Sequence, residues 1–247
     1  MRLEVSGAVQ AGPPRLEVRV DLANRGDTPA AALSVEGELL GGRDAARLEA
    51  LPAGQTSSAL LRFDVGAPRP GVYPLALHLQ YSRPGAPTVE ASQRAYLLLA
   101  LGASVPPAVR LAVPDVRIDV TAPVVARLES ADARPHRVRL RLLTPRGLQP
   151  FGPDPEAQVP ASGSASAELR LLRGTAPRPS RQGIVVLAET VGEELASASA
   201  ATAVVDVEPD PAWLPRLRRP LAAAAVALLV AALYVELRRK RRSSSST

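Results

Sequence analysis

An apolar run near the C-terminus constrains this chain more than any other feature of its sequence. Residues 220–235 carry no charged side chain, and a basic run at residues 238–242 follows almost at once. Trp213 precedes the run, Tyr234 lies near its end, and the two are 21 positions apart. At a helical rise of about 1.5 Å per residue they would be about 31 Å apart, close to the hydrocarbon thickness of a bilayer. The run therefore predicts a single membrane-spanning helix.

The predicted anchor divides the end of the chain into three parts. Residues 210–219 form a juxtamembrane segment, residues 220–237 the transmembrane helix, and residues 238–247 a basic polar tail. A buried soluble helix is the alternative, but it would be expected to show a polar stripe. The residues expected to contact the bilayer are Trp213, Leu221, Leu228, Leu229, Leu233 and Tyr234. The basic residues expected to determine topology are Arg238, Arg239, Lys240, Arg241 and Arg242.

The positive charge of the chain is concentrated around this anchor. The whole chain has 30 basic and 24 acidic residues, a balance that would suit a nucleic-acid binder. Residues 1–210, however, hold 22 arginines against 23 acidic residues, whereas residues 211–247 hold eight basic residues and one glutamate. We therefore expect the bilayer as a partner, through residues 220–237, and no nucleic acid.

Topology follows from the basic residues on the two sides of the span. Five lie after it and three before it, which favours a cytoplasmic tail and extracytoplasmic N-terminal domains. The first residues show a strand pattern and no signal peptide, so a trimmed or misassigned start and a tail-anchored topology both stay open. The chain has no cysteine, which excludes disulfides and thiol nucleophiles.

The remaining length fits two domains of about 100 residues each. Its 25 prolines and 17 glycines separate short runs of alternating apolar residues, the pattern of an all-β chain. The clearest strand places Tyr73, Leu75 and Leu77 on one face and His78 on the other. About seven strands are expected in residues 1–102, a number that suits an immunoglobulin-like sandwich.

A stiff linker with paired prolines at Pro106 and Pro107 opens the second expected domain, residues 103–209. Its predicted strands lie around residues 116–120, 138–142, 167–171, 184–188 and 205–207. The predicted fold is therefore all-β, with two tandem immunoglobulin-like β-sandwiches followed by one transmembrane α-helix.

Three segments of the first domain carry a family resemblance. They are residues 16–26, which end in Asn24-Arg25-Gly26, then residues 51–55, and then Gly71-Val72-Tyr73. Together they resemble the bacterial cell-adhesion-related and NEW3-type immunoglobulin-like domains. The resemblance implies a β-sandwich used outside the cytoplasm for adhesion, spacing or complex assembly, and it implies no catalysis.

The residues themselves indicate no catalytic, cofactor-binding or metal site. His78 lies on the polar face of its strand and His136 follows Pro135, so both are expected at the surface without a neighbour at metal-ligand or triad spacing. A possible interaction face comes from Arg137, Arg139 and Arg141, which alternate with apolar residues and so share one sheet face. There they would be a solvated surface or would bind an anionic polymer or lipid headgroups.

The sequence thus predicts a non-enzymatic, single-pass membrane protein that needs no cofactor. Its two β-sandwiches would serve as a scaffold or protein-interaction module of the cell envelope, with a protein partner whose identity the sequence does not reveal. The alternatives are a module that binds an envelope polymer or carbohydrate, and an accessory subunit of a membrane enzyme or transport complex.

Overall fold

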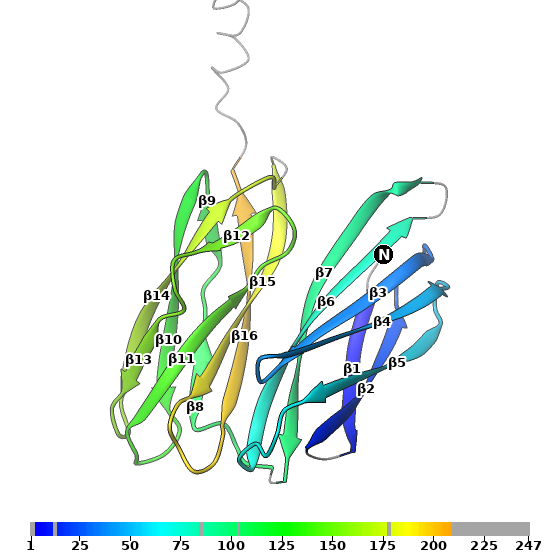
Figure 1. Ribbon diagram of the computed structural model, residues 1–247. Coiled ribbons are helices and arrows are strands. Elements are labelled where there is room, and N and C mark those ends of the chain that lie inside the picture. The colour runs from blue at the N-terminus through cyan, green and yellow to red at the C-terminus, as the bar shows by residue number, and fades with distance from the viewer. Residues whose placement is uncertain (1–2, 12–13, 84–85, 103, 177–178, 209–247) are drawn as a thin grey trace, which may run out of the picture. The chain divides into compact units, whose positions relative to one another are not determined.

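Regular secondary structure in this protein consists of β-strands over all the residues that can be described. The computed structural model describes residues 3–11, 14–83, 86–102, 104–176 and 179–208 of the 247-residue chain. Residues Met1–Glu208 belong to one compact unit. Figure 1 shows two groups of strands, each built from two sheets that enclose a core. This arrangement confirms the predicted all-β, immunoglobulin-like sandwich class.

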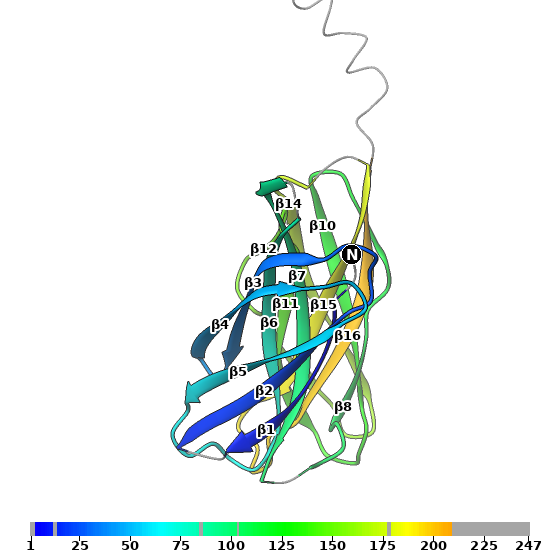
Figure 2. The same cartoon turned by 90° about the vertical axis from the view of Figure 1, so that its right-hand side faces the viewer.

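The first sandwich consists of a three-stranded sheet in the order β1-β2-β5 and a four-stranded sheet in the order β4-β3-β6-β7. All neighbouring strands in both sheets are antiparallel. The sheet that contains β1, β2 and β5 faces the viewer in Figure 2. The strand bounds are β1 Leu3–Ala11, β2 Arg15–Asn24, β3 Ala30–Leu39, β4 Gly42–Leu51, β5 Thr56–Asp64, β6 Gly71–Arg83 and β7 Ala86–Leu101.

Strict alternation of apolar side chains forms this core. In β2, Leu16, Val18, Val20 and Leu22 are fully buried while the residues between them point outward. Because successive strand residues face opposite sides, this period of two directs every second side chain into the sandwich. The tight turn between β3 and β4 has positive φ at both Leu40 and Gly41, as a two-residue hairpin requires.

The second sandwich has a four-stranded sheet in the order β12-β14-β10-β8 and a five-stranded sheet in the order β13-β11-β15-β16-β9. One pair, β16 with β9, is parallel. The four edge strands of this second sandwich have only three or four residues each. The bounds are β8 Val109–Ala112, β9 Val116–Ile118, β10 Thr121–Ser130, β11 His136–Leu143, β12 Leu148–Phe151, β13 Glu156–Val159, β14 Ser164–Arg173, β15 Ser180–Thr190 and β16 Ala198–Val207.

Sequence patterns identify the central strands of this second sandwich better than its other strands. The predicted strands correspond to β9, β11, β14, β15 and β16, whereas β8, β10, β12 and β13 were missed. The long strand β10 contains Pro123, which suggests a break in a single sequence. In the structure Pro123 points away from the core, while Ala122, Val124 and Ala126 fill it.

Two separate clusters of buried residues lie on either side of the predicted boundary between residues 102 and 103. Leu101 is the last core residue of the first cluster and Val109 the first of the second. The predicted transmembrane helix lies outside the described residues. Within the part of the chain that is described, no helix is long and apolar enough to cross a bilayer.

Candidate functional site

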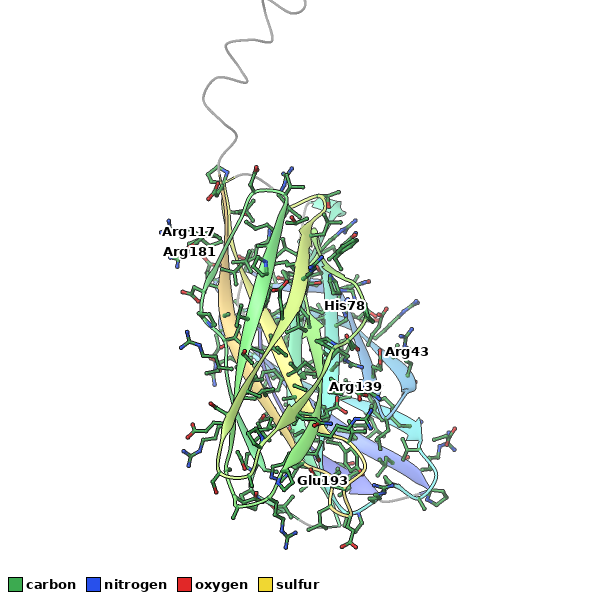
Figure 3. The ribbon with its side chains drawn as sticks, turned by 90° about the vertical axis from the view of Figure 1, so that its left-hand side faces the viewer. Arg43, His78, Arg117, Arg139, Arg181 and Glu193 are labelled. Atoms are coloured by element: carbon green, nitrogen blue, oxygen red, sulfur yellow. The ribbon has the colours of Figure 1, made fainter. Side chains whose placement is uncertain are left out.

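The three arginines predicted to form an interaction face do share one side of β11. Each of them is paired with a carboxylate (Arg139 is labelled in Figure 3). The Nε atom of Arg137 donates to Glu156 of β13 at 2.7 Å, and Nη2 of Arg139 donates to the other oxygen of the same carboxylate at 2.8 Å. These hydrogen bonds, that of Arg139 first, lower the pKa of Glu156. Two of the three arginines therefore share one carboxylate within the second sandwich, which compensates one of their two positive charges.

Arg141, the third arginine, joins the two sandwiches. Its Nη1 atom donates at 2.8 Å to Glu38 of β3, and Glu38 also pairs with Arg43 at 3.2 Å. Nearby, Nε of Arg94 on β7 donates to the backbone carbonyl of Thr144 at 3.2 Å. We call this region of contact between the two sandwiches the seam; its main residues are Glu38, Gly71, Ala76, Arg94, Arg141, Leu187 and Ala196.

The seam also contains a small apolar layer. Leu187 is fully buried and Val185 nearly so, yet neither belongs to the core of either sandwich. Both lie on the outer side of β15, and this strand contacts β6 and β7 of the first sandwich. Ala76 of β6 is likewise buried outside both cores. Burial of these side chains makes the seam a packed interface in addition to a set of ion pairs.

Beside this layer lies a polar groove of about 910 Å³, lined by residues from both sandwiches. His78 sits in it with its Nδ1 atom 3.4 Å from Glu36 and 3.3 Å from the side-chain amide of Gln80. Burial, and then the nearby positive charge of Arg94, lower the pKa of His78. The folded state therefore favours the neutral imidazole, and its polar position agrees with the alternation of β6.

At one end of the seam the two sandwiches pair through their backbones. The N–H of Val72 donates to the carbonyl of Ala196 at 2.8 Å, and the N–H of Ala196 donates to the carbonyl of Pro70 at 3.0 Å. Gly71, with φ of 143°, lies between these bonds. A Cβ atom at Gly71 would lie 2.5 Å from the nitrogen and 2.7 Å from the carbonyl carbon of Ala196. Only glycine permits so close an approach.

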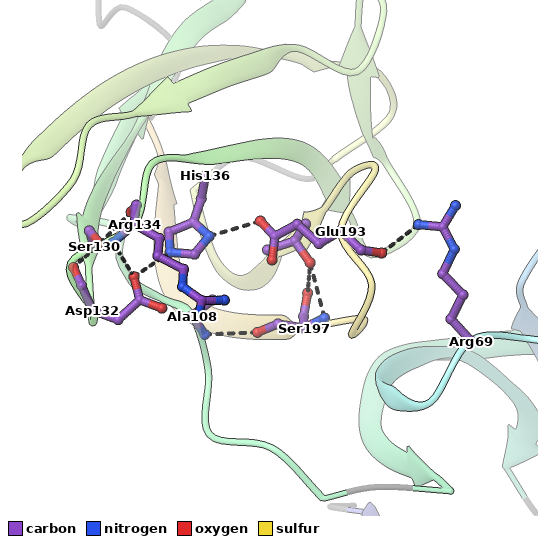
Figure 4. A network of polar contacts seen from close by, with 9 residues as sticks. Arg69, Ala108, Ser130, Asp132, Arg134, His136, Glu193 and Ser197 are labelled. Atoms are coloured by element: carbon purple, nitrogen blue, oxygen red, sulfur yellow. Dashed lines mark hydrogen bonds and ion pairs between the residues drawn. The ribbon is translucent and has the colours of Figure 1, made fainter.

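His136 contacts the loop between β15 and β16 that contains Ala196. The structure corrects the prediction that this histidine lies at the surface. The residue begins β11 and is 5% exposed. Figure 4 shows its ring between two carboxylates: Nδ1 is 2.8 Å from Glu193 and Nε2 is 2.7 Å from Asp132. The prediction failed because Glu193 is 57 residues away in sequence, so only the fold brings the two together.

The backbone of Glu193 connects this histidine to the first sandwich. A guanidinium nitrogen of Arg69, in the loop before β6, donates to the Glu193 carbonyl (Figure 4). On the other side of the loop, the N–H of Ala108 in the linker donates to Oγ of Ser197 at 2.8 Å. The loop between β15 and β16 is thus held by β11, by the linker and by the first sandwich together.

One sequence signal could have revealed the seam. Residues 184–188 read Ile-Val-Val-Leu-Ala, an unbroken apolar run, whereas a strand with one solvated face alternates apolar and polar residues. The run indicates that β15 is covered on both faces. Gly71 stands out only as part of the Gly71-Val72-Tyr73 segment, and nothing comparable marks Glu193, because the roles of both depend on distant partners. Among the described residues, no group of three or more histidine, aspartate or glutamate side chains is placed to hold a metal ion.

The predicted anchor residues and topology-determining residues lie outside the described part of the chain. They comprise Trp213, Leu221, Leu228, Leu229, Leu233 and Tyr234, and Arg238, Arg239, Lys240, Arg241 and Arg242. Their roles stay predictions.

Comparisons with known proteins identify no family. No family model matches the chain, and no curated protein matches it in sequence. Among solved structures, the chain aligns with a red sea bream transglutaminase at 16% identity and a TM-score of 0.28, covering 83% of this chain and 31% of the other. A Salmonella alpha-2-macroglobulin aligns at 13% identity and a TM-score of 0.33, over 84% of this chain and 16% of the other.

A protein of unknown function from Porphyromonas gingivalis aligns at 17% identity and a TM-score of 0.31, over 83% of this chain and 99% of the other. The chain thus spans less than a third of the transglutaminase and of the macroglobulin. Identities and TM-scores this low carry no argument about function. The resemblance to adhesion-related and NEW3-type domains rests on the sequence segments alone, and the class that the fold itself defines is the immunoglobulin-like β-sandwich.

Proposed function

We propose that this protein is a non-enzymatic, single-pass membrane protein that presents two joined β-sandwiches as a scaffold or protein-interaction module of the cell envelope. The observation that carries the proposal is the seam. Backbone pairing between Gly71 and Ala196, a buried Leu187 and the Glu38–Arg141 ion pair connect the two sandwiches directly. A scaffold must hold a fixed spacing between its binding surfaces, and a packed seam supplies that property.

The membrane part of the proposal rests on residues 220–237 and their basic flank. The helix would place the bilayer next to the tail, with residues 1–208 on the extracytoplasmic side because more basic residues follow the span than precede it. The adhesion-like resemblance supports the same side of the membrane. A protein partner would then bind one of the exposed sheet faces.

Truncation and protease protection test attachment and topology separately. The full chain is expected in the membrane fraction, whereas a chain ending at Glu208 is expected to be soluble, folded and monomeric. Protease added outside spheroplasts is expected to degrade residues 1–208 and to spare a tag placed after Thr247. Loss of the tag with survival of the N-terminal residues would instead show a cytoplasmic orientation, and aggregation of the truncated chain would show that the last residues are needed for folding.

A second candidate is a module that binds an acidic envelope polymer. It is favoured by another groove, of about 700 Å³, whose described lining includes Arg94 and Arg146, hydroxyl groups and amides but no carboxylate. Guanidinium groups bind carboxylates and phosphates well. Binding of a carboxylated polysaccharide, measured by calorimetry, would be expected to weaken in Arg94→Gln and to persist in Arg170→Gln. Equal binding by both variants would argue against the groove.

A further inference from the structure

The ring of His136 makes two contacts that a neutral imidazole cannot make as hydrogen bonds at the same time. Its two nitrogens face carboxylate oxygens of Glu193 and Asp132, at 2.8 Å and 2.7 Å. An ionised carboxylate only accepts hydrogen bonds, and a neutral imidazole has a single N–H group. Both contacts are therefore satisfied only when the ring carries two protons. Loss of one proton leaves a nitrogen lone pair facing an oxygen lone pair.

The charged groups around His136 favour this doubly protonated ring. Asp132 and Arg134 lie in the turn before β11, Glu193 and Glu194 lie in the loop between β15 and β16, and Arg69 reaches that loop from the first sandwich. Burial by itself would lower the pKa of His136, but the hydrogen bonds of Glu193 and Asp132 outweigh it and the pKa is raised. The pKa of Asp132 is lowered, first by the backbone N–H of Arg134 and then by His136.

The loop that His136 holds is the one that joins the sandwiches. Glu193 supplies its side chain to His136 and its backbone carbonyl to Arg69. Three residues further on, Ala196 forms both backbone hydrogen bonds with the first sandwich. The contacts of His136 and the end of the seam thus lie on the same short stretch of backbone, residues 193–196.

We propose that His136 is a proton-dependent latch: its imidazolium holds the β15–β16 loop against β11, and loss of one ring proton releases the loop and loosens the contact between the two sandwiches. The latch would respond to a rise in pH, since the proton is bound in the closed state. It acts on the seam that supports the proposed scaffold function, but it depends on neither a membrane nor a partner, so the two proposals can fail separately.

The protonation state can be read directly, because His136 and His78 are the only histidines in the chain. Long-range proton–nitrogen spectra of the ¹⁵N-histidine-labelled full chain in detergent are expected to show both ring nitrogens of His136 protonated at neutral pH. His78→Gln removes the second set of signals and so assigns the first. A singly protonated His136 ring at neutral pH would overturn the proposal.

Hydrogen exchange measured by mass spectrometry tests the coupling to the seam. Peptides that contain the Val72 and Ala196 amides are followed in the full chain from about pH 5.5 to about pH 9, with correction for the intrinsic pH dependence of exchange. Their protection is expected to fall roughly tenfold or more as His136 loses its proton, because the loop then loses a hydrogen bond to a charged group.

Two variants separate the latch from general destabilisation. His136→Gln is expected to show weak protection of these two peptides at every pH, with normal protection of the second core. His78→Gln is expected to keep the wild-type fall in protection on the alkaline side of about pH 6.5, because the pKa of His78 is lowered and its titration affects only the acid side. The proposal fails if the profile of His136→Gln matches the wild type, or if wild-type protection stays constant while the spectra show His136 titrating. If His136→Gln does not fold, the wild-type comparison of spectra and exchange still decides.

Discussion

The two parts of the seam join the sandwiches by different means. In its middle, half-exposed ion pairs surround a small apolar layer: the side chains of Arg141 and Glu38 are 29% and 31% exposed, while Leu187 is fully buried. At its loop end, backbone pairs with backbone around Gly71, and a buried histidine stands behind the loop. Apolar burial in the middle tolerates small displacements, whereas the loop end has no room for a single added carbon.

This difference indicates which contacts determine the strength of the join. Partly exposed ion pairs contribute about 0–1 kcal/mol each, because water screens them and their long side chains lose freedom. A buried leucine contributes more. A backbone approach that admits only glycine is lost when any side chain is added. We therefore expect the conspicuous charges of the seam to have the smallest effects and its least conspicuous residues the largest.

The largest effect is expected from the apolar layer. Leu187→Ala should lower the free energy of unfolding by about 2–5 kcal/mol, the usual range for a buried leucine. Leu98→Ala is the matched control, because Leu98 is 41% exposed, and it should change stability by no more than about 0.5 kcal/mol. Chemical denaturation of the chain ending at Glu208 measures both. Similar losses at the two positions would mean that the middle of the seam is not a packed interface.

Gly71→Ala should cost about 2–4 kcal/mol, because the new methyl group meets the backbone of Ala196 and the φ of 143° is unfavourable for alanine. Gly192→Ala, in the loop that Gly71 contacts, also has positive φ but nothing within 4 Å. Its cost should be limited to backbone strain, about 1–2 kcal/mol. Thermal unfolding and exchange of the Ala196 amide would measure the difference, and equal costs would refute a tight approach.

His136→Gln should cost about 1.5–3 kcal/mol near pH 6, the contribution of one hydrogen bond to a charged group. Because the pKa of His136 is raised in the fold, its stabilising contribution is complete below the unfolded pKa of about 6.5 and disappears as pH rises through the folded value. The variant should therefore approach wild-type stability at alkaline pH. Thermal midpoints measured across this range would test the convergence.

His78 supplies the contrast to His136, because its pKa is lowered. The folded state disfavours its protonated form, so stability is lost as pH falls through about 6.5, and His78→Gln should reduce that acid sensitivity. If both histidine variants shifted the pH profile in the same direction, the assignment of opposite roles to the two rings would be wrong.

The smallest effect is expected for the Glu38–Arg141 ion pair. A double-mutant cycle with Glu38→Gln and Arg141→Gln should give a coupling energy of about 0.2–1 kcal/mol that decreases with added salt. The pair Glu17–Arg62 within the first sandwich, with side chains 32% and 53% exposed, should give a similar or smaller value. A coupling energy well above this range would mean that ion pairs contribute most of the stability of the seam.

Much of the fold could be predicted from the sequence because alternation is a local signal. The face-by-face pattern of Tyr73, Leu75 and Leu77 is sufficient to locate β6, and the positions of Arg137, Arg139 and Arg141 on one face follow from the same period of two. Strand β10 was missed since Pro123 interrupts its pattern, and the short edge strands contain too few residues to show one.

The candidate site was less predictable, since its residues acquire their roles from distant partners. Gly71 resembles any other turn glycine until Ala196 is placed against it, 125 positions later in the chain. His136 follows a proline, as a surface residue in a turn would, but a loop 57 residues away covers it. Arg141 has the pattern of a free basic face, yet its partner is Glu38 of the other sandwich.

The sequence by itself therefore determined the β-sandwich class, the faces of the central strands and the apolar segment at residues 220–235, because each is encoded by neighbouring residues. Only the tertiary structure decided that the two sandwiches are joined along a seam, that Gly71 must be glycine and that His136 is buried between two carboxylates. The physical reason is that periodicity is a property of a segment, whereas burial, close backbone approach and a shifted pKa belong to groups that only the folded chain brings together.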